Sequence, residues 1–259
     1  MISVLTALAL VGAASGPEVS SNTPPTVQTD AASSELVENA ILASPALSAQ
    51  LEKLKQGGQF KGFSVITETG GQPEGRTALR AWRKSGVIIL RADLVEDLRT
   101  SDRRFRTFDY TKNNPNDLVF VVAFLAAKIE TEADLMRLEQ ESMIKFRESV
   151  KSAPPGSPID VTALLKEGID RNIKNDARAY IVGWNAICDA ATKAKGMPLT
   201  PKEWAELFMK SRYSAALFKS MRNPANRIVI PASMTMALDE HNIAAVATAL
   251  TTMPMPDFR

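Results

Sequence analysis

The chain has 259 residues, of which 45% are hydrophobic and 23% are charged, as in an ordinary globular protein with a substantial core. Its 31 Lys and Arg against 29 Asp and Glu give a net charge of +2, which provides no general attraction for nucleic acid, so we expect no nucleic-acid partner. One histidine (His241) and one cysteine (Cys188) exclude a three-histidine or paired-cysteine zinc site and an intramolecular disulfide.

The first segment of the chain is typical of an exported protein. An apolar run from Ile2 to Ala14, followed by small residues and Pro17, predicts a signal peptide over residues 1–16 and a secreted or periplasmic protein of bacterial type. No Lys or Arg precedes the run, so the alternative is an apolar N-terminal segment of a cytoplasmic protein. The run is shorter than the ~20 residues that cross a bilayer, and no other window is apolar enough, so we expect no stable membrane span.

Residues 17–34 are rich in Ser, Thr, Pro and Ala and have no hydrophobic period, which predicts a flexible tether. We expect a single globular domain over residues 35–259. Ser44 and Pro45 suit the N-cap and the first position of a helix, and leucines at helical spacing continue this helix up to Gly57.

In the section that follows, apolar and polar residues alternate, which is typical of the strands of a small sheet. Residues 60–66 indicate one strand, and residues 79–83 and 87–90 flank Ser85 and Gly86 as the two strands of a hairpin. We expect a mostly antiparallel sheet that one helix covers.

Long helices dominate the rest of the chain. The pattern predicts one helix over residues 117–150, which is apolar nearly all round at first and amphipathic later. A second long helix is expected after Asp160, a capping box of Thr200 and Glu203 starts a third, and a last helix follows Asp239. The expected fold class is therefore α+β, a small antiparallel sheet followed by a bundle of long helices.

This order of a small sheet, a long buried helix and a second long helix resembles that of the zincin metallopeptidases. Residues 121–128 are similar to the apolar approach to an HExxH helix, in which two histidines one turn apart bind zinc and the glutamate is the general base. Residues 175–179 are similar to the helix that provides the acidic third ligand in the glutamate-zincin branch. The resemblance covers roughly residues 79–190 and implies a zincin-like fold there.

The residues that define the HExxH motif are replaced in this chain. Phe124 stands at the first histidine, Leu125 at the glutamate and Lys128 at the second histidine, whereas Asp176 alone retains a possible ligand. Because phenylalanine and a charged lysine offer a metal no lone pair, the resemblance implies a catalytically inactive scaffold without a metal or other cofactor. We expect such a protein to act by binding another protein or a cell-envelope polymer.

A sharper hypothesis concerns the two charges at this place. Lys128 and Asp176 are expected to form an ion pair between the two long helices, because an unpaired charge between apolar helices is costly. The alternative places both residues on solvated helix faces, where most charged residues lie.

Glu130, Glu132 and Asp134 are a second set of candidate residues. Paired carboxylates across a cleft can hydrolyse glycosidic bonds, so these acids indicate a secreted cell-wall hydrolase as an alternative function. Like charges four residues apart on a helix are, however, typical of a solvated surface. A third alternative, an intracellular protein-interaction domain, applies if residues 1–16 are not a signal peptide.

Overall fold

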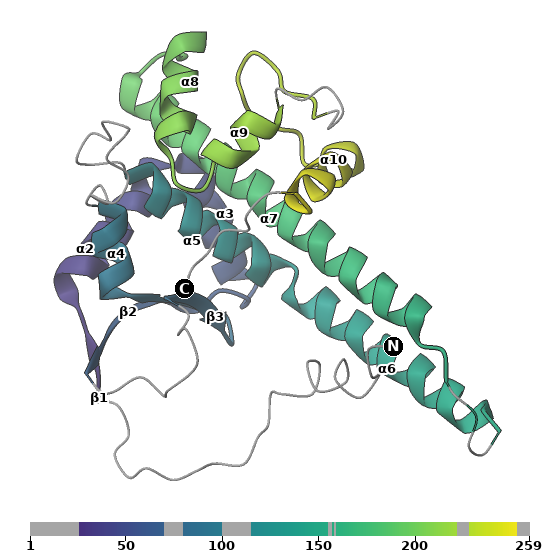
Figure 1. Ribbon diagram of the computed structural model, residues 1–259. Coiled ribbons are helices and arrows are strands. Elements are labelled where there is room, and N and C mark those ends of the chain that lie inside the picture. The colour runs from purple at the N-terminus through teal and green to yellow at the C-terminus, as the bar shows by residue number, and fades with distance from the viewer. Residues whose placement is uncertain are drawn as a thin grey trace.

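The computed structural model describes residues 26–69, 80–99, 115–154, 157, 159–221 and 228–252, so the predicted signal peptide lies outside the described residues. The helices and strands follow in the order β1 (Thr26–Thr29), α2 (Ala31–Ala43), α3 (Pro45–Gln56), β2 (Gly62–Thr69), β3 (Ala81–Lys84), β4 (Val87–Arg91), α4 (Ala92–Arg99), α5 (Pro115–Glu130), α6 (Glu132–Ser152), α7 (Thr162–Lys195), α8 (Pro201–Lys210), α9 (Ala215–Met221) and α10 (Glu240–Leu250). The predicted α+β class, a small sheet followed by long helices, is confirmed (Figure 1).

The sheet has the strand order β1-β2-β4-β3. β1 pairs antiparallel with β2, and β3 forms the predicted antiparallel hairpin with β4, with Ser85 and Gly86 in the turn at φ of 52° and 83°. The central pair, β2 and β4, is parallel rather than antiparallel as predicted. Burial explains this difference, because Ile88 and Leu90 of β4 are fully buried and suit the middle of the sheet, whereas the polar β3 suits its edge.

Regular structure begins before residue 35. Asp30 caps α2 by accepting a hydrogen bond from the backbone N–H of Ser33 at 3.1 Å, and Val37 of α2 is fully buried. The prediction of a tether over residues 17–34 is therefore wrong for residues 26–34, which form β1 and the start of α2. The first turn of α2 is Ala-Ala-Ser-Ser, without a large apolar side chain, so it carries no hydrophobic period.

The helix predicted over residues 117–150 is interrupted. α5 ends at Glu130 and α6 begins at Glu132, with Thr131 between them at φ −96° and ψ −2°. The Thr131 hydroxyl lies 2.7 Å from the side-chain oxygen of Asn175 on α7 and 3.3 Å from the Ala127 carbonyl oxygen. A hydroxyl that bonds to the preceding turn in this way perturbs the helical ladder, and no pattern of apolar residues records it.

α5 forms the centre of the core, in contact with α7 along its length. Residues 118–127 of α5 are all at most 5% exposed. Phe120 meets the ring of Tyr180 edge-on, with the centroids 5.0 Å apart, and it lies against Gly183, where a Cβ would come within 2.8 Å of the ring. Glycine at this position therefore allows α5 and α7 to pack closely.

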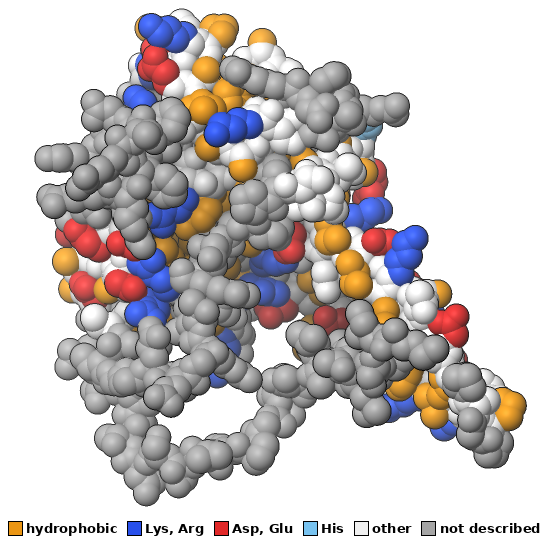
Figure 2. Space-filling model, viewed as in Figure 1, with side chains coloured by type: hydrophobic (Ala, Val, Ile, Leu, Met, Phe, Trp, Pro, Cys, Tyr) orange, Lys and Arg blue, Asp and Glu red, His pale blue; other side chains and the backbone are white. Residues whose placement is uncertain are grey.

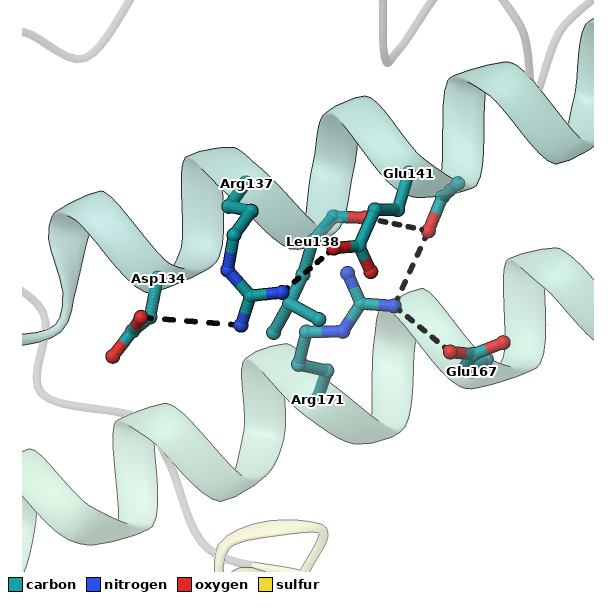
Figure 3. Close-up of polar contacts among 7 residues, drawn as sticks. Asp134, Arg137, Leu138, Glu141, Glu167 and Arg171 are labelled. Atoms are coloured by element: carbon teal, nitrogen blue, oxygen red, sulfur yellow. Dashed lines mark hydrogen bonds and ion pairs between the residues drawn. The ribbon is translucent and has the colours of Figure 1, made fainter.

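α6 and the first half of α7 leave the body together and run side by side, as an antiparallel helical hairpin (Figure 1). We call this hairpin, α6 with residues 162–176 of α7, the arm. Arg171 of α7 donates to the hydroxyl of Ser142 on α6 at 3.3 Å and thereby joins the two helices (Figure 3). α6 has no buried residue. Among the described helices, none is both long enough and apolar enough to cross a membrane.

Candidate functional site

A pocket of about 450 Å³ lies at the junction of the body and the arm. Its wall is formed by β3, the end of α5, the start of α6 and the middle of α7, through the residues Arg83, Lys128, Glu132, Leu135, Met136, Glu139, Asn172, Asn175 and Asp176. Two of the residues singled out by the zincin resemblance, Lys128 and Asp176, are in this wall. This pocket is the candidate functional site.

Lys128 and Asp176 are brought together by the packing of α5 against α7. The Lys128 ammonium donates to Oδ1 of Asp176, and the two side chains are 16% and 25% exposed. The predicted ion pair is therefore present, and the alternative of two separate solvated faces does not describe these residues. The pair neutralises both charges at the floor of the pocket, where each has lost much of its hydration.

Phe124 lies one turn before Lys128 on α5 and is 5% exposed. Its ring meets Tyr180 edge-on at a centroid separation of 6.5 Å, and the Lys128 ammonium lies 5.9 Å from the centroid of the Phe124 ring. A cation at this distance is attracted to the ring, so Phe124 supports the position of the ammonium. Leu125 is also 5% exposed and belongs to the hydrophobic core rather than to the pocket wall.

Asn175 and Thr131 form a second polar contact beside the ion pair. Asn175 is 8% exposed, and its side-chain oxygen accepts a hydrogen bond from the Thr131 hydroxyl at 2.7 Å. The amide nitrogen of Asn175 is buried and has no hydrogen-bond partner among the described residues. A buried donor of this kind costs free energy, so the Asn175 amide is held in place at the expense of one hydrogen bond.

Each of the three acids proposed for a cell-wall hydrolase lies near a different arginine. Glu130 lies 3.7 Å from Arg178 and accepts a hydrogen bond from Gln50 at 3.3 Å. Glu132 lies 3.9 Å from Arg83, and Asp134, whose side chain is 78% exposed, lies 4.0 Å from Arg137.

Of these acids only Glu132 lines the pocket, so the structure does not bring two of them to face each other across it. A glycosidase needs two carboxylates that flank one bond. The arrangement therefore gives the cell-wall hydrolase alternative no support, and the described residues contain no group of three or more His, Cys, Asp or Glu placed to hold a metal ion.

Three residues of the pocket wall are not among those that the sequence predicts for the site: Arg83, Asn172 and Glu139. A usable signal existed for Asn172, because it lies four residues before Asp176 and therefore on the same face of α7. Arg83 reaches the pocket from the edge strand of the sheet, and Glu139 from the arm. Neither position has a local pattern that distinguishes it from a solvated charge.

No family model, curated protein or solved structure matches this chain.

Proposed function

We propose that the chain is an exported, metal-free and non-catalytic protein with a zincin-like scaffold, which binds another protein at the pocket between its body and its arm. The observation that carries this proposal is the Lys128–Asp176 ion pair. It occupies the position at which the resemblance implies a histidine ligand and an acidic ligand of zinc.

The chemistry of the pair explains why such a scaffold would bind rather than cleave. An ammonium group has no lone pair for a metal, and it also neutralises the single acid that retains ligand character. Phe124 fills the position of the other histidine with an apolar ring that packs against Tyr180. An open pocket is left, lined by side chains suited to recognition.

The composition of the pocket favours a polypeptide over a cell-envelope polymer. Arg83 and Asn172 offer donors, and Glu132 and Glu139 offer acceptors, so both groups of a peptide backbone find partners there. The neighbouring strand β3 is at the edge of the sheet and, among the described strands, pairs only with β4. An exposed strand edge can pair with an extended peptide, which adds affinity without demanding a particular sequence.

A peptide library selected on the purified protein tests this proposal. Peptides that bind the wild-type chain should bind at least tenfold more weakly to Asn172→Trp, in which an indole fills the pocket. Lys174→Trp is the matched control, because Lys174 is on the same helix, is 55% exposed and does not line this pocket. Equal binding to both variants, or no selected peptides, would contradict a peptide-binding pocket.

A further inference from the structure

The arm has a row of exposed apolar side chains. α6 contributes Met136, Met143 and Val150, which are 56%, 47% and 42% exposed. α7 contributes Leu165 and Ile169, which are 40% and 58% exposed. We call these five residues the arm face, and Figure 2 shows apolar side chains at the surface along the arm.

Helical spacing places the arm face on one side of the hairpin. Met136 lines the pocket, and Met143 and Val150 follow it at intervals of seven residues, which is two turns of helix. On α7, Leu165 and Ile169 precede two further pocket residues, Asn172 and Asp176, by seven residues each. Both rows therefore continue outward from the pocket on the same side of the arm.

An apolar face of this kind is unusual on a surface helix. α6 has no buried residue, and its contacts with α7 use a different side, where Leu138, Ser142 and Phe146 are half-buried. A two-helix hairpin with a second apolar row has the pattern of half a four-helix bundle. The row thus indicates an interface that the isolated chain leaves open.

The charges beside the arm face are arranged so that the face of one copy is complementary to the face of a second copy. Glu139 and Arg147 lie four residues before and four residues after Met143, both are exposed, and neither has an ion-pair partner among the described residues. Met136 and Val150 lie seven residues before and after the same methionine. In an antiparallel arrangement about Met143, Glu139 of one arm meets Arg147 of the other, and Met136 meets Val150.

We propose that two copies of the chain associate through their arm faces, antiparallel about a two-fold axis at Met143, and form a four-helix bundle. A parallel arrangement would place Glu139 against Glu139 and Arg147 against Arg147, which like-charge repulsion disfavours. The two-fold axis makes every favourable contact occur twice, as in other isologous interfaces. Because Met136 and Glu139 also line the pocket, this dimer would cover part of the wall at which we propose that a peptide binds.

Sedimentation equilibrium of the full chain tests the association. The wild-type chain should have the mass of two copies at micromolar concentration, and Met143→Glu should have the mass of one. Ile144→Glu is the matched control, because Ile144 is 55% exposed and is adjacent in sequence but turned about 100° away from the arm face. A wild-type chain that is monomeric at 200 µM would overturn the proposal.

Two further variants test the orientation. Met143→Cys should form a disulfide-linked dimer on mild oxidation, because the two-fold axis brings this position next to its own copy, whereas the buried Cys188 should not react. Glu139→Arg and Arg147→Glu should each weaken the dimer by at least tenfold, and the two changes together should restore it. No disulfide at position 143, or a charge exchange that fails to restore the dimer, would overturn the antiparallel arrangement.

Discussion

The Lys128–Asp176 pair is neither fully buried nor fully exposed to solvent. Its side chains are 16% and 25% exposed, so each charge has lost hydration and depends on the other for compensation. The Phe124 ring, with its centroid 5.9 Å from the ammonium, adds a weak attraction. Removing one partner should therefore cost more than removing both.

A double-mutant cycle measures this dependence. Lys128→Met should lower the free energy of unfolding by about 1–2 kcal/mol, because it leaves the Asp176 carboxylate half-buried without its cation. Adding Asp176→Asn or Asp176→Leu should recover part of that loss, with a coupling energy of at least about 0.5 kcal/mol by chemical denaturation.

The Lys174–Glu240 pair provides the control. Its atoms lie 3.9 Å apart, and its side chains are 55% and 86% exposed, so the same cycle there should give a coupling near zero. Additive losses at Lys128 and Asp176 would show that the two charges act independently despite their contact.

At this scale the sequence allowed the ion pair to be predicted but not its surroundings. Lys128 follows the apolar run of α5, so its charge needed compensation, and Asp176 on the other long helix could be sought as its partner. The contact of Thr131 with Asn175 could not be found in this way. A hydroxyl and an amide have no net charge to compensate, and their pairing depends on the register of two helices 44 residues apart in the chain.

At the scale of elements, α7 contains two glycines in different surroundings. A Cβ on Gly183 would lie 2.8 Å from the Phe120 ring, whereas a Cβ on Gly168 would meet nothing within 4 Å. Helix propensity favours alanine at both positions by roughly 0.5–1 kcal/mol, so any difference between them reports on packing alone.

Gly183→Ala should destabilise the protein by about 1–3 kcal/mol, because the Phe120 ring must move and the α5–α7 contact must open. Gly168→Ala should stabilise it by about 0.5–1 kcal/mol through helix propensity. Thermal unfolding of the two variants beside the wild type checks both signs. Similar stabilities for the two variants would mean that α5 and α7 do not approach as closely as described.

The elements also show which structural features can be read from local sequence. Ser44 with Pro45 and Thr200 with Glu203 begin α3 and α8 as predicted, because a cap is a contact between residues close in the chain. The parallel pairing of β2 with β4 could not be predicted, since it depends on which strand is apolar enough for the middle of the sheet. The break at Thr131 likewise requires α7 as a partner.

At the scale of the whole molecule, the proposed zincin-like scaffold can be tested by restoring a metal site. The combination Phe124→His, Leu125→Glu and Lys128→His places two histidines one turn apart on α5, the second of them at the position that contacts Asp176 of α7. The folded triple variant should bind one zinc ion per chain by titration calorimetry, whereas the wild-type chain should bind none.

Adding Asp176→Ala to the triple variant is the control and should abolish zinc binding. If the triple variant does not fold, Lys128→His alone should still bind zinc more tightly than the wild type, because it replaces the ammonium by an imidazole beside the carboxylate. Stoichiometric zinc on the wild-type chain, or none on a folded triple variant, would contradict the proposed metal-free, zincin-like scaffold.

The length of α7 has a mechanical consequence. This helix has 34 residues without interruption, so it is a continuous rod of roughly 51 Å that passes from the core into the projecting hairpin. Thr162, at its free end, is 14 positions from Asp176, or roughly 21 Å. A swing of about 5° at Asp176 would displace that end by about 2 Å and hardly move the carboxylate. A fluorescent or spin probe at Thr162 would thus magnify small motions that originate at the base of the rod.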